Sequence, residues 1–436
     1  MNRVYLDYNA TTPVDPQVLD AMLPYFSADF ANASSIHSPG QHARAAVETA
    51  REQVAALIGA KPQEIVFTSG GTESDNHAIF GVLAAKVGQT FLSVSSPQAP
   101  TASSEFNPAA NAGRPHSSSS ASLTSSTSST SIFSPHLITT VIEHEAVLNA
   151  CQAAETQGAN VTFLAVNREG LVDPESLRRG IRPETILISV MHANNELGTV
   201  QPLEEIGRIA KEHKIYFHTD AVQSAGKIPI DVNALNVDLL SLSGHKLYAP
   251  KGVGALYIRT GTRLKQFLYG GHHQRGARPG TENVAGIVGL GKAAEIARIS
   301  LVTDAARIAT LRDKLERGLL ERIPQIRVNG ASAPRTPNTT NIQFAGIEGE
   351  ALVIALDLKG LACSVGAACS SGAVEPSHVL TAIGLSQDEA KSSLRFSLGR
   401  HTTESEIAFA LEAIPAAVTQ LRAIAPTYRK EAASHV

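Results

Sequence analysis

Short apolar runs alternate with longer stretches of helical periodicity along the first two thirds of the chain. Runs rich in β-branched and aromatic residues predict buried strands, and a 3.6-residue period predicts amphipathic helices. Their alternation is typical of a parallel sheet with crossover helices. We predict strands at Glu64–Thr68, Leu137–Ile142, Val161–Ala165, Ile186–Val190, Tyr216–Thr219, Val237–Leu242 and Gly254–Ile258, and helices at His42–Ile58, Glu145–Thr156 and Leu203–His213.

A different pattern begins near Val284, where long helical stretches surround a single strand-like run. This order does not continue the alternation of strands and helices in the first part of the chain, so we predict a second, smaller α+β domain with its boundary near residue 300. The fold class is therefore α/β, with a mainly parallel sheet in the larger domain. The elements predicted in the second part are a strand at Thr339–Phe344 and helices at Glu350–Lys359 and Glu404–Ile424.

A segment rich in serine and threonine interrupts the first pattern. From Ser117 to Ser131 the chain has thirteen Ser or Thr in fifteen residues, after a stretch rich in Pro, Ala and Asn. This composition buries too little apolar area to offset its ordering entropy. We predict a disordered surface insertion over residues 93–136. A tether or modification site is the alternative, but a tolerated insertion is favoured because long surface loops add little closure cost.

Charge and composition narrow the range of functions. The chain has 37 Lys+Arg against 40 Asp+Glu, a net charge of −3, so nothing in the overall balance favours binding to nucleic acid or an anionic membrane. No apolar run reaches the ~18–20 residues that span a bilayer. The opening MNRVYLDYNATTP resembles neither a signal nor a transit peptide. We therefore expect a cytoplasmic protein.

The three cysteines are Cys151, Cys363 and Cys369. They cannot form a disulfide framework, and they contain no CxxC pair for zinc. Cys369 stands in SVGAACSSG, among small residues that offer little apolar burial, which indicates a reactive thiol on a loop. We assign Cys151 and Cys363 to packing.

A lysine and an aspartate follow two neighbouring predicted strands. Lys246 ends SLSGHK, and Asp220 ends the run IYFHTD, with Gln223 three residues later. A lysine amine can form a Schiff base, and a carboxylate can pair with a pyridine nitrogen, as in enzymes that use pyridoxal phosphate (PLP). Either residue alone is more often a surface lysine or a helix cap. Together, at the carboxyl ends of sheet strands, they predict a PLP site.

A glycine-rich turn, Ser69–Ser74, links the strand EIVFT to a helix predicted from about Asp75. Glycines let backbone N–H groups approach an anion, and a helix N-terminus adds partial positive charge. The turn lacks the GxxxxGK[ST] pattern of nucleotide P-loops. It predicts a phosphate cradle, with a simple tight turn as the alternative.

These features occur within a longer set of motifs, and with them the chain resembles the cysteine desulfurases. That family comprises PLP-dependent enzymes that supply sulfur for iron–sulfur cluster assembly and related thiolation. The resemblance covers almost the whole chain outside the Ser-rich segment, and the loop GAACSSG is similar to the long-loop branch. The motifs, in the family's order, are YLDYNATTP, TSGGTESDN, EHEAV, MHANNELG, HTDAVQSAGKIPID, SLSGHKLYAPKGVGALY, RPGTEN, GAACSSG and SSLRFSLGR.

The resemblance implies a fold-type I PLP-dependent transferase that forms a homodimer. The large domain would span residues 16–300, and residues 1–15 with 301–436 would form the small domain that carries Cys369. Lys246 would hold PLP as a Schiff base, Asp220 would pair with the pyridine nitrogen, and Gln223 would hydrogen-bond the ring oxygen. The phosphate would be held by Gly71, Thr72, Ser243 and His245, with Thr281 reaching it from the partner subunit.

The resemblance also implies how the reaction runs. His144 would stack on the ring and serve as an acid or base, and Asn195, which also belongs to the cofactor site, would clamp the carboxylate of L-cysteine with Arg395. Lys246 would remove the Cα proton. The thiolate of Cys369 would then attack the substrate sulfur, leaving a persulfide and releasing L-alanine.

Further roles and rival functions complete the prediction. A sulfur acceptor or cluster scaffold would be the protein partner, and Cys369 would be the ligand of any transient [2Fe–2S] cluster shared with it. A selenocysteine or cysteine-sulfinate lyase of the same fold is one rival function. A silent scaffold that binds sulfur-transfer proteins is another, although an intact set of Lys246, Asp220 and Cys369 argues against it.

Overall fold

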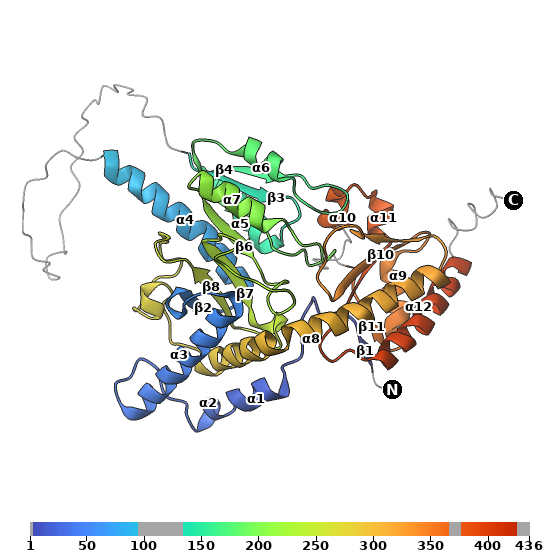
Figure 1. Ribbon diagram of the computed structural model, residues 1–436, viewed down its shortest axis with the longest axis horizontal. Helices are drawn as coiled ribbons and strands as arrows, with labels where there is room; N and C mark the ends of the chain where they lie inside the picture. Colours follow the sequence, from blue (N-terminus) through green and yellow to red (C-terminus); the bar gives the residue numbers. More distant parts are fainter. Residues whose placement is uncertain (1–2, 95–133, 366–375, 425–436) are drawn as a thin grey trace, which may run out of the picture.

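A seven-stranded sheet forms the centre of the larger part of the molecule (Figure 1). The computed structural model describes residues 3–94, 134–365 and 376–424. The strand order is β2-β8-β7-β6-β5-β3-β4; neighbours from β7 to β4 run parallel, and β8 is antiparallel to both β2 and β7. This confirms the predicted mainly parallel sheet. The strands are β2 Ile65–Thr68, β3 His136–Thr140, β4 Asn160–Leu164, β5 Thr185–Ser189, β6 Tyr216–Asp220, β7 Leu239–Ser243 and β8 Gly254–Ile258.

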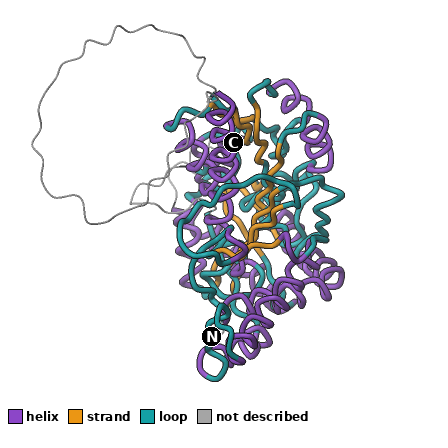
Figure 2. The backbone as a smooth tube through the Cα atoms, turned by 90° about the vertical axis from the view of Figure 1, so that its left-hand side faces the viewer, coloured by secondary structure: helices purple, strands orange, loops and turns teal. Residues whose placement is uncertain are grey.

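Helices cover both faces of this sheet, which lies between them as a central layer (Figure 2). On one face α3, α6, α7 and α8 pack over buried residues such as Phe217 and Tyr257. On the other face α4 and α5 pack over Leu187 and Leu239. Burial on both faces makes most of the strands rich in apolar and β-branched residues, which is why the sequence pattern finds them. The helices are α1 Pro16–Met22, α2 Pro24–Ser27, α3 Ser38–Ile58, α4 Gly71–Val94, α5 Glu145–Thr156, α6 Pro174–Gly180, α7 Leu203–Glu212 and α8 Val284–Arg322.

A smaller antiparallel sheet, ordered β12-β10-β9, lies beside the large one, and a short parallel pair joins β1 to β11. The C-terminal half of α8, with α9 and α12, closes its core. By length and composition α12 could cross a membrane, but its buried side packs in this core. The elements are β1 Val4–Tyr5, β9 Ile326–Asn329, β10 Thr339–Phe344, β11 Leu361–Ala362, β12 Ser393–Ser397, α9 Gly349–Leu358, α10 His378–Ala382, α11 Gln387–Lys391 and α12 Glu404–Ile424.

Helix α8 connects the two cores without a break over 39 residues. Leu290 and Ala294 belong to the core of the large sheet, whereas Leu311 and Leu315 belong to the core of the small sheet. The boundary predicted near residue 300 therefore falls inside a continuous helix, and the division into domains stays a prediction.

The Ser-rich insertion lies mostly outside the described residues, as does the loop that carries Cys369. The predicted limits of the insertion, 93–136, need correction at both ends. Helix α4 continues to Val94, and β3 begins at His136, so these end residues belong to regular elements.

Candidate active site

A cavity of about 570 Å³ opens where the carboxyl ends of the parallel strands meet the small sheet. This edge is where open α/β sheets bind ligands, and the volume suits a small molecule. Ten of the twelve residues that the sequence assigned to the site line this one cavity: Gly71, Thr72, His144, Asn195, Asp220, Gln223, Ser243, His245, Lys246 and Arg395.

Lys246 ends a short 3₁₀ turn, Gly244–Lys246, that follows β7 directly. Its amine donates hydrogen bonds to two backbone oxygens, those of Asn9 and Ala10, the second at 2.6 Å. Burial, aided by the charge of Arg395, lowers the pKa of Lys246 to about 8. The amine is therefore substantially neutral near pH 8, as a nucleophile or a base must be.

Asp220 ends β6 and presents a buried carboxylate to the cavity. Its Oδ1 accepts a hydrogen bond from the backbone N–H of Val222 at 2.8 Å. Burial raises the pKa of Asp220, while the nearby His144 and Lys246 lower it. A cationic ring nitrogen beside this carboxylate would therefore stabilise its charged form.

Two further acids, Asp75 and Glu143, lie buried near Asp220, and the sequence reasoning assigned neither a role. Burial raises the pKa of Glu143 to about 8, and burial together with the charge of Asp220 raises the pKa of Asp75 well above its ordinary value. Within the described part of the chain, Asp75 Oδ1 and Glu143 Oε2 have no hydrogen-bond partner. His218, 3.6 Å from Asp75, is neutral because burial lowers its pKa to about 3. Burial therefore favours the protonated forms of Asp75 and Glu143.

The glycine-rich turn forms the first turn of α4, which begins at Gly71 rather than near Asp75 as predicted. The first N–H groups of a helix have no partner within it, so this turn offers donors and partial positive charge to an anion. A Cβ on Gly71 would come within 2.8 Å of Val222 Cγ2, so only glycine fits there without a shift. Ser243 and His245 line the same cavity, which makes the arrangement suitable for a phosphate group.

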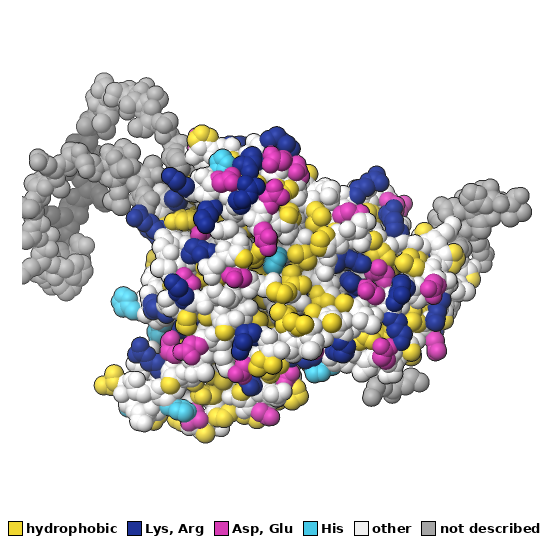
Figure 3. Space-filling view, viewed as in Figure 1, with side chains coloured by type: hydrophobic (Ala, Val, Ile, Leu, Met, Phe, Trp, Pro, Cys, Tyr) yellow, Lys and Arg dark blue, Asp and Glu magenta, His cyan; other side chains and the backbone are white. Residues whose placement is uncertain are grey.

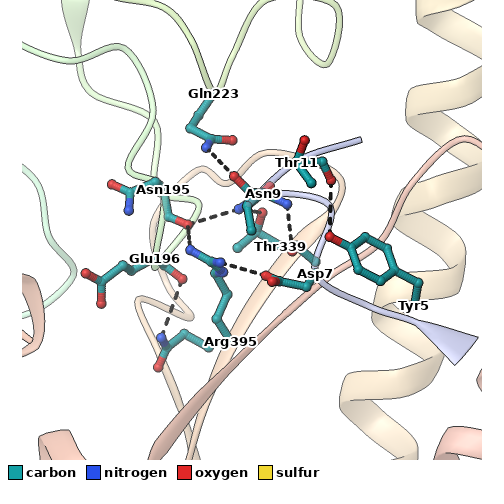
Figure 4. A network of polar contacts seen from close by, with 12 residues as sticks. Tyr5, Asp7, Asn9, Thr11, Asn195, Glu196, Gln223, Thr339 and Arg395 are labelled. Atoms are coloured by element: carbon teal, nitrogen blue, oxygen red, sulfur yellow. Dashed lines mark hydrogen bonds and ion pairs between the residues drawn. The ribbon is translucent and has the colours of Figure 1, made fainter. Parts of the chain in front are cut away.

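Arg395 lies on β12, and its guanidinium is held from two sides (Figure 4). Nη2 donates to Asp7 Oδ1 at 2.7 Å, and Nη1 donates to the backbone oxygen of Asn195 at 3.0 Å. Nε has no partner among the described residues, although it is buried. The planar cation is thus fixed in place with an N–H left over, which suits recognition of a carboxylate. Asn195 contributes its backbone oxygen here, while its side chain points away from the guanidinium (Figure 4).

The segment that follows β1 connects these groups, and no residue of its motif, YLDYNATTP, was predicted to belong to the site. Asn9 Nδ2 donates to the backbone oxygen of Asn195 at 3.0 Å and to Thr339 Oγ1 at 2.9 Å. Its own backbone oxygen accepts from Gln223 (Figure 4) and also from Lys246. Asn9 therefore links the side of the cavity that carries Lys246 to the side that carries Arg395.

One predicted site residue lies outside the cavity, and another lies outside the described residues. Thr281 is exposed and does not line it in its own chain, although Arg278, three residues earlier, forms an ion pair at 2.8 Å with the cavity residue Glu73. Cys369 lies outside the described residues, four positions after Val365. Ser364, the neighbour of Val365, lines the cavity.

Cys151 and Cys363 are both buried, in agreement with their assignment to packing. Burial is the main cause that raises the pKa of each thiol, to about 12 for Cys151. Neither thiol is therefore a nucleophile near neutral pH. In the described ranges, no group of three or more His, Cys, Asp or Glu residues is arranged to hold a metal ion.

Comparisons with known proteins agree with this geometry. A family model, "Aminotransferase class-V", matches residues 4–97 and 129–409. "Cysteine desulfurase IscS" from Dictyoglomus turgidum is 45% identical over 428 residues, covering 98% of this chain and 97% of that protein. The IscS protein from Anaeromyxobacter dehalogenans is 47% identical over 428 residues, covering 98% and 95%.

Solved structures give the same result. One described as a "NifS-like protein" has a TM-score of 0.79 at 34% identity, covering 96% of this chain and all of that one. Another, "SspA in complex with cysteine", has a TM-score of 0.73 at 36% identity, covering 92% and 99%. The chain therefore belongs to the class-V aminotransferases and, within them, to the cysteine desulfurases, which confirms the predicted family, fold and enzyme class.

The family is PLP-dependent, and the residues present fit that cofactor. An amine of lowered pKa, a buried carboxylate and a helix N-terminus surround a single cavity.

The gap between the two ranges that match the family model takes in most of the Ser/Thr-rich segment, so this segment is an insertion relative to the family.

Proposed function

We propose that this enzyme takes the sulfur atom from L-cysteine, forms a persulfide on Cys369 and releases L-alanine. The observation that carries the proposal is one cavity holding Lys246, Asp220 and Arg395 together, in a chain whose full-length relatives are named cysteine desulfurases. PLP would be held by Lys246, Asp220 and Gln223 and, at its phosphate, by the residues predicted above. When bound, it supplies an electron sink for charge that develops at the substrate Cα.

The chain's own residues bind the substrate and move its protons. Arg395 binds the carboxylate, and Lys246 takes the Cα proton. His144 Nδ1 accepts the backbone N–H of Ala146 at 3.1 Å, which leaves Nε2 to exchange a proton at the cavity. The thiolate of Cys369 attacks the substrate sulfur. The Cβ–S bond breaks, Cβ keeps the electron pair and gains a proton, and the sulfur remains on Cys369.

The position of Cys369 in the chain supports this role. The cavity-lining Ser364 is five residues away in sequence, and four extended residues beyond Val365 reach at most ~14 Å. A thiol within this distance of Val365 is close enough in the chain to serve the cavity. The acceptor or scaffold, and a transient [2Fe–2S] cluster bound through Cys369, remain part of the proposal.

A homodimer is supported by an apolar surface. Large side chains on and after α2 are strongly exposed: Phe26 62%, Phe30 75% and Ile36 93%. Figure 3 shows apolar side chains gathered over α1 and α2 at the lower edge of the view. Exposed patches of this kind are typical of protein interfaces. In a homodimer, Thr281, which does not line the cavity of its own chain, would complete the cavity of the second copy.

The free thiols of Cys151 and Cys363 support a cytoplasmic location.

Arg395→Lys is expected to raise the KM for L-cysteine about 10- to 100-fold with a smaller change in kcat, because lysine cannot reproduce the guanidinium fork. Steady-state alanine formation measures both constants. Arg179→Lys, at an exposed ion pair with Asp173 on α6, is the matched control and should change neither constant. An unchanged KM for Arg395→Lys would contradict the assignment of Arg395 to the substrate carboxylate.

The lowered pKa of Lys246 predicts a pH dependence for proton removal. With a pKa of about 8, the neutral fraction rises from about one tenth at pH 7 to about nine tenths at pH 9. Exchange of the Cα proton of L-alanine with D₂O should therefore accelerate over this range. Measuring it in Cys369→Ser removes any contribution from that thiol. A rate that is flat or falls with pH would contradict a Lys246 amine of lowered pKa as the base.

The experiment that tests the proposed function compares substrates. Purified protein with PLP is given L-cysteine, selenocysteine or cysteine sulfinate, and alanine is measured for the wild type and for Cys369→Ser. We expect L-cysteine turnover to depend on Cys369. Turnover of the other two compounds alone, independent of Cys369, would instead establish one of the rival lyases. Lack of any turnover and of a visible cofactor band would favour a silent scaffold.

A further inference from the structure

A second lysine, Lys227, lies beside the wall of the cavity, and the mechanism above does not use it. Its amine lies 2.8 Å from Gln223 Oε1 and 3.1 Å from Asn9 Oδ1. Gln223 and Asn9 both line the active-site cavity. Lys227 therefore contacts two cavity residues without being one of the residues that line the cavity.

The turn after β6 brings Lys227 back over Gln223, four residues earlier. Gly226 makes this possible with a φ of 69°, a left-handed conformation that disfavours other residues. A Cβ at Gly226 would also come within 2.6 Å of Leu247 Cδ2. Because Leu247 follows Lys246, the turn packs directly against the segment that carries the catalytic lysine.

The contacts of Gln223 determine the orientation of its side-chain amide. Nε2 donates to the backbone oxygen of Asn9 at 3.0 Å, and Oε1 accepts from Lys227. The reversed amide would set its oxygen against the carbonyl of Asn9 and lose that hydrogen bond in either charge state of Lys227, and it would also lose the bond to Lys227 when the amine is protonated. With Oε1 engaged by Lys227, the second N–H of Gln223 is the group left for a ligand in the cavity.

The two hydrogen bonds do not depend on the charge of Lys227. Burial, followed by the charges of Lys246 and Arg395, lowers the pKa of Lys227 to about 7. An ammonium group has three N–H bonds and a neutral amine has two, so either form can donate to both Gln223 and Asn9. The orientation of the Gln223 amide is therefore kept on both sides of neutral pH.

We propose that Lys227 is a positioning residue that locks Gln223 as a hydrogen-bond donor toward the oxygen on the cofactor ring. The proposal rests on the PLP site proposed above. Lys227 acts through Gln223, so its effect on cofactor binding should exist only while the Gln223 amide is present.

The test is a double-mutant cycle on PLP affinity and absorbance. Lys227→Met keeps the length of the side chain and removes its N–H donors. We expect Lys227→Met to weaken PLP binding about 10-fold and to shift the visible absorbance maximum. In a Gln223→Leu background, the same substitution should cause no further change in either quantity. Lys227→Arg, which keeps N–H donors, should weaken PLP binding and shift the absorbance maximum less than Lys227→Met does.

Lys211→Met is the matched control, because Lys211 also donates to an amide oxygen, Asn236 Oδ1 at 3.0 Å, but at the exposed end of α7. It should leave PLP affinity and absorbance unchanged. Equal losses from Lys227→Met with and without the Gln223 amide would overturn the proposal, as would no loss at all. If Lys227→Met does not fold, the cycle is run with Lys227→Leu, which also lacks N–H donors. A wild type that binds no PLP would overturn the proposed function instead.

Discussion

Cys369→Ser is expected to abolish sulfur transfer while leaving the cofactor in place. A serine hydroxyl has nearly the same shape, but it is not ionised near neutral pH and is a poor acceptor for sulfur. The rate of alanine formation from L-cysteine should fall on the order of 10³-fold or more. The visible absorbance of bound PLP should remain, because Lys246, Asp220 and the first turn of α4 are unchanged.

Cys151→Ala is the control for this substitution. The Cys151 thiol is buried in the core that α4 and α5 form against the sheet, and burial raises its pKa, so its loss should not change the rate per folded molecule. Full sulfur release by Cys369→Ser would show that another group accepts the sulfur, and it would remove the central residue of the proposal.

Lys246→Ala is expected to remove the covalent attachment of PLP. The visible band should be lost on gel filtration, whereas wild-type protein keeps it, because the remaining contacts are not covalent. Exchange of the Cα proton should fall by about 10²- to 10⁴-fold, the usual contribution of a positioned base. Absorbance after filtration and deuterium exchange into L-alanine measure the two effects separately.

Lys265→Ala, which removes an exposed lysine outside the cavity, should change neither property. Retention of a covalently bound cofactor by Lys246→Ala would show that a different amine holds it. Lys227 would then be the group to examine first, because its pKa is also lowered and it shares Asn9 with Lys246.

The sequence predicted the large sheet well for a physical reason. Most of its strands are buried along their whole length and are rich in apolar and β-branched residues, and the predicted limits differ from the observed ones by at most two residues. The small sheet was harder to predict. In it, β12, which carries Arg395, alternates polar and apolar residues. Outside it, β1 has only two residues and pairs with β11 far along the chain.

The same contrast applies to the site. Lys246, Asp220 and the glycine-rich turn follow strands directly, so a local pattern could indicate them. Asp7 is different, because its role comes from a hydrogen bond with Arg395, 388 residues away. Asn9 likewise acts through contacts between distant segments, whereas Lys227 lies only four residues after Gln223 and contacts it through the turn at Gly226. Motif matching found the residues that would touch the cofactor and missed those that hold them in place.

Intact-mass measurement tests the central claim most directly. The protein is incubated with PLP and L-cysteine without reductant, and peptide mapping then locates any added mass. We predict the gain of one sulfur atom on Cys369, its removal by a thiol reductant, and its absence in Cys369→Ser. Alanine formation without added sulfur on Cys369, or with the sulfur on Cys151 or Cys363, would contradict the account.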